Sequence, residues 1–299
     1  MQSEPAEWRV PSYILVVMLS ALIAGLFGCI IGSFLNVAVM RRHVMTLGGR
    51  SRCMSCTRTI AWYDNIPVLS WALLGGRCRW CKSIISAQYP IVEGVTAVLF
   101  ALLVYAWEST TPAQLILLGI YLTITALLVA IAVYDLRHTI IPDAWVWTFN
   151  ALALLSVVLF PYPLADALYA YLAGPITALP LFTLWFVSGG RWMGLGDAKL
   201  ALGIGWLLGP VYGILAIFSA FIIGAVVSVF VLLPMPYILD WLKRVSAPYH
   251  FLHTMFGVKN GKGYTMKSEV PFGPFLIAAM FSVWFALLYH IPIPILWIY

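Results

Sequence analysis

Four of the five cysteines fall in two Cys-x2-Cys pairs, Cys53 with Cys56 and Cys78 with Cys81, and 21 residues separate the pairs. Two such pairs are the usual framework of a tetrahedral four-thiolate zinc site, because each pair forms a tight knuckle that points both sulfurs at one metal ion. In a reducing cytoplasm, where the charge distribution discussed below predicts this loop to lie, a double disulfide is disfavoured, and a redox motif would need only one pair. The spacing therefore predicts structural Zn2+, with unmetallated or redox-active thiols as the alternative.

Two acidic residues border apolar runs. Asp135 lies in "LLVAIAVYDLRHTIIPD", where Pro142 stops the helix, and Asp197 follows Gly194 and Gly196 in "RWMGLGDAKLALGIGW". Two facing carboxylates in a weakly hydrated pocket do not both ionise easily, so they share one proton. An aspartic protease uses this arrangement: the ionised acid takes a proton from water and the protonated acid polarises the peptide carbonyl.

A simpler interpretation exists for each acid. Asp143 and Asp197 precede apolar helices and could cap them, and Asp135 or Asp197 could pair with Arg137 or Lys199. For an isolated Asp, capping or pairing is the commoner role.

The composition sets the class of protein. Of 299 residues, 63% are hydrophobic and only 9% are charged, against about a quarter charged in soluble domains. A bilayer core needs roughly 20 apolar residues in a helix. We therefore predict an all-α polytopic membrane protein of about eight transmembrane helices, at 12–40, 88–107, 114–134, 144–161, 167–187, 198–209, 212–235 and 274–297.

The distribution of basic residues predicts the orientation. The loop after the first helix carries eight Lys and Arg residues and one acid, Asp64, for a net charge of +7. Cytoplasmic loops retain such residues, so this loop is predicted to be cytoplasmic and the N-terminus to face outward. Both Asp135 and Asp197 then lie at cytoplasmic helix ends. Alternatively, the positive charge could only set the orientation of the chain in the membrane or attract anionic lipid.

Three regions follow from these assignments. They are 1–40, the outward N-terminus and first transmembrane helix, 41–87, a small four-cysteine zinc loop domain, and 88–299, the multi-helix core. A loop of this size is too small to hold a core by itself, so zinc would stabilise it. Cys29 lies between Gly28 and Gly32, where we predict close helix packing instead of a metal ligand.

Six blocks of the sequence carry a resemblance to a known family. They are "GSFLNVAVMRR" (32–42), "SRCMSC" with "WYDNIPVLSWALLGGRCRWC" (51–81), "SAQYPIVE" (86–93), "YDLRHTIIPD" (134–143), "MGLGDAKLALGIGWLLG" (193–209) and "VPFGPFLIA" (270–278). In this order they closely resemble the blocks of bifunctional type IV prepilin peptidases. The sequence departs from the family at Thr57 and Lys82, where many relatives are expected to have Gly, which affects only the local turns.

The resemblance implies a GxGD-type membrane aspartyl protease with Asp135 and Asp197 as the catalytic pair. It implies cleavage of basic leaders from prepilins and pseudopilins at the cytoplasmic face of the bacterial inner membrane, for type IV pili and type II secretion. It also implies methylation of the new N-terminal amine with S-adenosylmethionine. No donor-binding residue is assigned, although Glu93 could serve that site or be a helix-start carboxylate. Membrane lipid is an expected partner, nucleic acid is not, and the oligomeric state stays open.

Two other classes of function are compatible with parts of the sequence. A proton- or cation-coupled transporter could use the same two aspartates as a relay, although the chain has no convincing internal repeat and the acids lie at helix ends. A noncatalytic scaffold could use the cysteine loop to bind a partner, but it would leave the paired acids unexplained.

Overall fold

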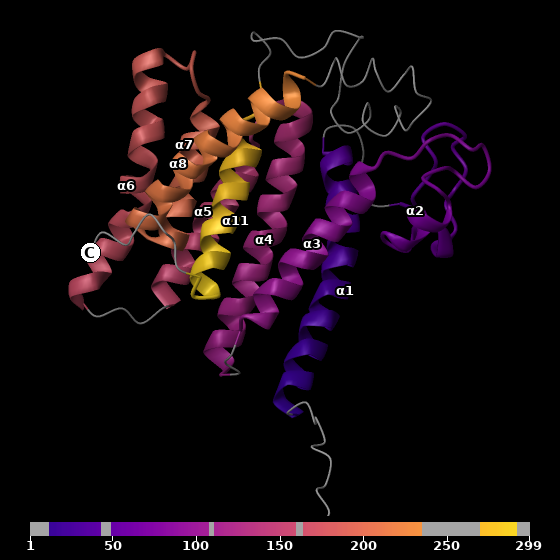
Figure 1. Cartoon of the computed structure of the whole chain (residues 1–299), viewed down its shortest axis with the longest axis horizontal. Coiled ribbons are helices and arrows are strands. Elements are labelled where there is room, and N and C mark those ends of the chain that lie inside the picture. The colour runs from indigo at the N-terminus through magenta and orange to yellow at the C-terminus, as the bar shows by residue number, and fades with distance from the viewer. Residues whose placement is uncertain (1–11, 43–48, 108–110, 160–163, 235–269, 292–299) are drawn as a thin grey trace, which may run out of the picture.

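A computed structural model of the chain describes residues 12–42, 49–107, 111–159, 164–234 and 270–291. These residues form a bundle of helices with one small side domain (Figure 1). They contain no β-strand, and only two isolated β-bridges occur, Arg52 with Thr59 and Arg77 with Ile84. The predicted all-α fold is confirmed.

A helix occupies each of the eight predicted apolar segments. The helices are α1 (Ser12–Arg41), α3 (Gln88–Tyr105), α4 (Pro112–His138), α5 (Asp143–Leu159), α6 (Leu164–Ser188), α7 (Leu195–Leu208), α8 (Pro210–Val227) and α11 (Gly273–Leu288). A π-helix, η2 (Ser228–Leu232), continues α8. By length and composition, α1, α3, α4, α6 and the α8–η2 unit could cross a membrane, and α5 and α11 are shorter apolar helices.

Helix α7 is the shortest of the eight, with 14 residues. At the helical rise of 1.5 Å per residue it is about 21 Å long, less than the roughly 30 Å of a bilayer core. It ends where Gly209 adopts a left-handed φ of 82°, and Pro210 starts α8. Asp197 lies in the first turn of α7, at the opposite end from this turn, and is buried.

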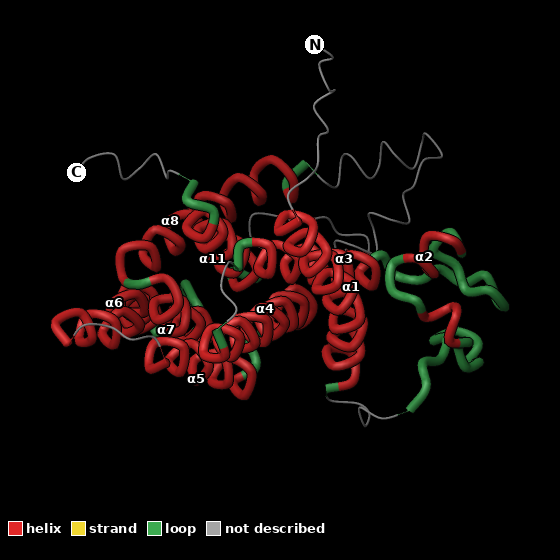
Figure 2. Tube along the Cα trace, turned by 90° about the horizontal axis from the view of Figure 1, so that it is seen from below, coloured by secondary structure: helices red, strands yellow, loops and turns green. Residues whose placement is uncertain are grey.

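The helices of the bundle bury a common apolar core. Figure 2 shows α4, α5, α7 and α11 grouped in the bundle, with α6 and α8 on one side and α1 and α3 on the other. The core cluster draws on most of them and includes the fully buried residues Leu128, Ile131, Val146, Phe149, Leu200, Ile204, Leu276 and Met280. The outer face of α1 is apolar and exposed, as lipid contact requires, at Leu15, Leu22, Leu26 and Ile30.

Close packing of α1 against α3 explains the glycines of the first helix. A Cβ atom at Gly28 would lie 2.8 Å from the backbone oxygen of Thr96, and one at Gly32 would lie 2.7 Å from the Cα atom of Glu93. The predicted close helix contact is confirmed, and Cys29 takes no part in the cysteine cluster of the described chain. Farther along α1, the buried Asn36 donates a hydrogen bond to the carbonyl of Tyr89, which also ties the two helices together.

The cysteine loop joins α1 to α3 and contains two short helices, η1 (Trp62–Asn65) and α2 (Leu69–Leu73). Both views place it beside α1 and α3, away from α5, α6, α7 and α8 (Figures 1 and 2). It leaves the bundle at the end where α4 stops and α11 begins. One end of the molecule therefore carries the loop and both acids that sequence analysis singled out.

Candidate functional site

The two Cys-x2-Cys pairs form a pair of equivalent turns. In the first turn the amide of Thr57 donates to the carbonyl of Cys53, and the amide of Cys53 donates to the carbonyl of Arg58. The second turn repeats both bonds, from Lys82 to Cys78 and from Cys78 to Ser83. Each turn thus aims two sulfurs to one side, as the spacing predicts for a metal knuckle.

The four sulfurs converge. The Sγ atoms of Cys53, Cys56, Cys78 and Cys81 all lie within 4.8 Å of one another, and Cys53 Sγ is 3.7 Å from Cys81 Sγ. A tetrahedral zinc ion with Zn–S bonds near 2.3 Å separates its sulfurs by about 3.8 Å. All four cysteines are free thiols. The donor set and its spacing therefore fit a four-coordinate zinc ion.

The chemistry of the thiols also suits a cation between them. The backbone of Cys56, the Ser83 hydroxyl and the backbone of Ser55 lower the pKa of Cys53 to about 6. At Cys56 the backbone of Arg58 lowers the pKa, but burial and the neighbouring sulfurs of Cys53 and Cys81 outweigh it and raise the pKa to about 11. Thiolates this close repel one another, and a metal ion would remove that repulsion.

Thr57 and Lys82 occupy the positions where glycine was expected. Each has a φ of 57°, in the left-handed region. A left-handed conformation costs a residue with a Cβ atom roughly 1–2 kcal/mol. The turns therefore keep the geometry that glycine favours, at the expense of local strain.

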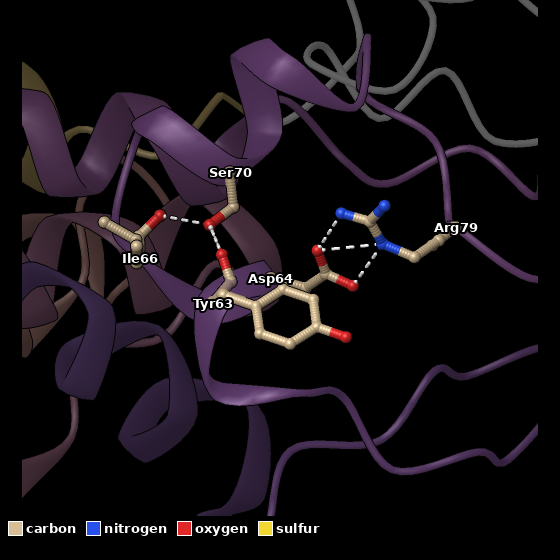
Figure 3. Close-up of polar contacts among 5 residues, drawn as sticks. All are labelled: Tyr63, Asp64, Ile66, Ser70 and Arg79. Carbon is tan, nitrogen blue, oxygen red and sulfur yellow. Dashed lines mark hydrogen bonds and ion pairs between the residues drawn. The ribbon is translucent and has the colours of Figure 1, made fainter.

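The segment between the knuckles is tied to the second knuckle by an ion pair that sequence analysis did not identify. The guanidinium of Arg79 donates three hydrogen bonds to Asp64, from Nη2 to Oδ1 at 2.6 Å and from Nε at 2.8 and 3.1 Å (Figure 3). These hydrogen bonds hold the pKa of Asp64 below its usual range. Beside them, the Ser70 hydroxyl contacts the carbonyls of Tyr63 and Ile66, which fastens α2 to η1.

Glu93 attaches the loop to the bundle. It lies in the second turn of α3, is 6% exposed, and accepts a hydrogen bond of 2.7 Å from the backbone amide of Val68. Val68 has a φ of 60°, which is unusual for a β-branched residue. The carboxylate of Glu93 therefore holds the loop against α3. This contact differs from both roles predicted for it, at the methyl-donor site or as a helix-start carboxylate.

Asp135 and Asp197 lie deep in the protein. Asp135, in the last turns of α4, is 4% exposed, and Asp197, in the first turn of α7, is 8% exposed. The two carboxyl groups are close enough to interact electrostatically. They come from helices far apart in the sequence, and α5 packs against both of these helices. The bundle therefore brings together the two acids named from the sequence.

The proposed cationic partners bind elsewhere. Arg137 Nε donates a 2.6 Å hydrogen bond to Gln88 Oε1, and Lys199 Nζ forms a 2.6 Å ion pair with Asp143. Within the described segments, neither Asp135 nor Asp197 forms an ion pair with a basic residue. Pairing with Arg137 or Lys199 thus does not account for the two buried acids.

Capping accounts for part of the position of Asp197. Gly194 is the N-cap of α7 and Asp197 is the third helical residue, and its carboxylate lies against Gly194. A carboxylate at this position commonly turns back to the N-cap amide. The contact orients Asp197 and leaves its interaction with Asp135 in place.

A third segment completes the site, and sequence analysis gave it no role. Gly273, the first residue of α11, lies so near that a Cβ atom there would be 2.5 Å from Asp135 Oδ2. The same Cβ would be 3.3 Å from Ile141 Cδ1, and a Cβ at Gly196 would be 3.0 Å from Ile141 Cβ. Ile141 therefore packs between the start of α7, which carries Asp197, and the start of α11. In the sequence, only the block "VPFGPFLIA" singled out this segment.

An apolar groove begins one residue from Gly273. It runs between α8 and α11, and η2 contributes Ser228 to it. Aromatic rings line much of it, and those of Phe221 and Phe272 are 4.8 Å apart between centroids. The remaining lining residues are Gly224, Ala225, Val270 and Phe275.

Comparisons with known proteins identify the class. Residues 26–107 match the family described as the bacterial peptidase A24 N-terminal domain, and residues 122–229 match the type IV leader peptidase family. The first match contains the cysteine loop, and the second contains both Asp135 and Asp197. The chain is thus a helical membrane protease, and α11 lies beyond both matched segments.

Similar curated proteins show which family of membrane proteases the chain resembles. The type 4 prepilin-like proteins leader peptide-processing enzyme of Escherichia coli O78:H11 is 33% identical over 213 residues, which cover 61% of this chain and 75% of that protein. A prepilin leader peptidase/N-methyltransferase of Aeromonas salmonicida is 32% identical over 234 residues, covering 68% and 78%. The corresponding protein of Pseudomonas aeruginosa is 29% identical over 296 residues, covering 88% of each chain. No solved structure gives a significant match.

The chain belongs to the type IV leader peptidase family. Its relatives from Aeromonas salmonicida and Pseudomonas aeruginosa are named for both peptidase and N-methyltransferase activity. This membership confirms the resemblance stated from the sequence blocks. It also disfavours the transporter and scaffold alternatives, which do not explain a match over both segments.

Proposed function

We propose that this protein cleaves the leader peptide from type IV prepilins and pseudopilins, with Asp135 and Asp197 as the catalytic pair. The observation that carries the proposal is the convergence of these two buried carboxyl groups within the segment that matches the leader peptidase family. Two buried acids held together, with no basic partner among the described residues, have the chemistry of an aspartic protease.

In the proposed reaction the two acids share one proton. The ionised carboxylate takes a proton from a water molecule while the water oxygen bonds to the peptide carbonyl carbon, and the protonated acid hydrogen-bonds to the carbonyl oxygen. The tetrahedral intermediate then collapses, the C–N bond breaks, and the leaving amine receives a proton from the pair. The products are the leader carboxylate and the mature protein with a new N-terminal amine.

Gly273 has a positioning role in this proposal. Its backbone leaves space for Asp135 Oδ2 where any side chain would intrude. The start of α11 thereby fixes the direction of one carboxylate, and Ile141 packs between the starts of α7 and α11. Precise placement of reacting groups matters because a displacement of about 1 Å can reduce a rate by about 100-fold.

The substrate is proposed to enter where the helices meet the cytoplasm. A peptide bond must be extended for water to reach it, whereas a membrane helix keeps its backbone in internal hydrogen bonds. Cleavage is therefore expected at the junction between the leader and the apolar segment. The apolar groove between α8 and α11 starts beside Gly273 and suits that segment.

The cysteine cluster is proposed to hold structural zinc through Cys53, Cys56, Cys78 and Cys81. Four thiolates fill the coordination sphere, so the ion would supply folding energy to the loop and no open position for substrate.

A second proposed activity is methylation of the new N-terminal amine, as the names of the relatives suggest. S-Adenosylmethionine would be the methyl donor. The described residues identify no pocket for this donor, so we assign none of them to it.

The proposed location is the bacterial inner membrane, with the N-terminus in the periplasm and the cysteine loop and both acids on the cytoplasmic side. A cysteine-accessibility assay on intact cells tests this orientation. A cysteine introduced at the N-terminus should react with an impermeant thiol reagent, and one introduced at loop residue Arg50 should react only after the cells are opened.

Leader cleavage of a synthetic prepilin by the purified protein tests the catalytic proposal. Asp135→Asn and Asp197→Asn should each abolish cleavage, and Asp143→Asn, which removes an exposed carboxylate, should retain it. Cleavage at the wild-type rate by either buried-acid variant would refute the mechanism.

A further inference from the structure

The cysteine loop exposes more apolar surface than its size and position explain. Large apolar side chains in it are strongly exposed, at Met54 83%, Trp62 76%, Leu73 78%, Trp80 60% and Leu69 51%. A soluble surface seldom gathers so many, and such patches commonly mark contacts with another molecule or a membrane. This surface is therefore a candidate contact site.

Two of the exposed segments are next to each other. Trp62 belongs to η1, and Leu69 and Leu73 belong to α2, and the hydrogen bonds from the Ser70 hydroxyl to the carbonyls of Tyr63 and Ile66 pack α2 onto η1. Figure 3 shows these contacts. We refer to Trp62, Leu69 and Leu73 together as the η1–α2 face.

The loop is fixed at the side of the bundle. Its two ends continue into α1 and α3, and Glu93 of α3 holds the amide of Val68, the residue before α2. Figures 1 and 2 both show the loop projecting sideways beyond α1 and α3. Because α1 and α3 could both cross a membrane, a domain projecting sideways from their ends overhangs the lipid surface around them.

The charge of the loop favours an anionic partner. Six basic residues of the described loop are exposed, namely Arg50, Arg52, Arg58, Arg77, Arg79 and Lys82. Only one acid, Asp64, lies among them, and Arg79 already binds it. An anionic membrane surface attracts Lys and Arg side chains that lie close to it.

We propose that the η1–α2 face rests in the headgroup region of the membrane that α1 and α3 cross, bound to anionic phospholipid. Trp62, Leu69 and Leu73 insert their apolar side chains at the boundary with the acyl chains, and the basic residues contact lipid phosphates. Tryptophan together with basic residues is the composition that membrane interfaces favour. The loop is thereby held at a fixed height above the membrane.

Two other occupants fit less well. A basic leader peptide would be repelled by a loop with a net charge of +7. A second copy of the chain would bring the same positive charge to the contact. Anionic lipid is the partner that satisfies both the apolar and the basic residues.

Photocrosslinking in nanodiscs tests the proposal on the full-length protein. The photoreactive residue p-benzoylphenylalanine replaces Leu73 in one variant and Trp62 in another. A lipid-facing bundle position, Phe218, serves as the positive control, and the fully buried Leu276 serves as the negative control. The nanodiscs contain phosphatidylcholine alone or mixed with phosphatidylglycerol, and mass spectrometry detects covalent lipid adducts.

The expected result is lipid adducts at positions 62 and 73, several times more abundant with phosphatidylglycerol and reduced by high salt, because salt screens exposed charges. The adducts at position 218 should not depend on lipid charge. Protein–protein adducts at position 73 would instead identify a second copy as the occupant and overturn the proposal. No adduct at 62 or 73 beside a strong signal at 218 would overturn it as well.

A variant without a photoreactive group keeps the test independent of crosslinking geometry. In Trp62→Ser/Leu73→Ser the apolar part of the face is removed, and Thr59→Ser is the matched surface control in the same loop. Hydrogen exchange of residues 62–73 in mixed nanodiscs should rise in the double variant and stay unchanged in the control, with metal content equal in both. Equal protection in all three proteins would contradict lipid contact.

Discussion

The cysteine loop and the aspartate pair are built in opposite ways. The loop takes its four ligands from two short turns, each closed by hydrogen bonds between residues at most five apart in sequence. The aspartate pair is built from residues of α4, α7 and α11, at positions 135, 197 and 273. These residues are far apart in sequence, so only the packing of the helices brings them together. Local turns determine the first region, and packing of long helices determines the second.

Because of this difference, a substitution that disrupts one region should leave the other region intact. Loss of a cysteine ligand should unfold the loop and leave the helical core packed, because the core cluster contains no residue of the loop. Loss of an aspartate should stop cleavage and leave the loop folded. Substitutions in each region test this independence, beginning with the largest effect.

The largest effect is expected from removing a metal ligand. Cys78→Ser should lose the zinc and the folded loop, because metal binding to small zinc domains contributes roughly 10–16 kcal/mol. Zinc content by atomic emission and limited proteolysis at residues 49–87 measure both. Cys29→Ser, which changes a cysteine outside the cluster, should retain one zinc per chain. Retention of zinc by Cys78→Ser would disprove the four-thiolate site.

A large effect confined to catalysis is expected at Gly273. Gly273→Ala places a methyl group against Asp135 Oδ2, and the carboxylate must turn away. We expect kcat for leader cleavage to fall by about 100-fold, with KM and thermal stability little changed. Gly119→Ala is the control, because a Cβ at Gly119 of α4 meets no atom within 4 Å. Equal kcat values in the two variants would remove Gly273 from the site.

A moderate effect is expected in the knuckles. Thr57→Gly and Lys82→Gly should each stabilise the metal-bound loop by about 1 kcal/mol, because glycine adopts the left-handed conformation without a Cβ clash. The rate of zinc loss to a chelator measures the change. Thr59→Gly, at a residue without positive φ, should accelerate zinc loss. Faster loss from both knuckle variants would show that the two turns are not strained.

The smallest effect is expected at Lys199. Its ammonium pairs with the exposed Asp143, and exposed pairs contribute about 0–1 kcal/mol. Lys199→Gln should therefore lower the melting temperature only slightly and leave cleavage near the wild-type rate. A loss of cleavage comparable to that of Asp197→Asn would indicate that Lys199 acts on the catalytic pair directly.

The sequence predicts these two regions unequally well. The cysteine spacing was sufficient for the knuckles because neighbouring residues form them, and apolar runs were sufficient for the eight helices. Apolarity and charge also singled out Asp135 and Asp197. The contact of Gly273 with Asp135, the contacts of Ile141 with Gly196 and Gly273, and the hydrogen bond from Val68 to Glu93 all join residues distant in sequence, so no local pattern reveals them.

The partners of the charged residues could not be predicted from the sequence either. Arg137 and Lys199 each lie two residues from a buried acid, and sequence spacing alone makes them suitable partners. In the folded chain they bind Gln88 and Asp143 instead. Helix geometry explains this, because residues two apart point to different sides of a helix.

The central claim is that Asp135 and Asp197 act together in cleavage, apart from the cysteine loop. The most direct measurement compares cleavage of a synthetic prepilin by wild type, Asp135→Asn and Asp197→Asn, with zinc content and methylation of a precleaved substrate followed in the same preparations. We predict that both variants lose cleavage and retain zinc and methylation. Cleavage near the wild-type rate in either variant would contradict this claim.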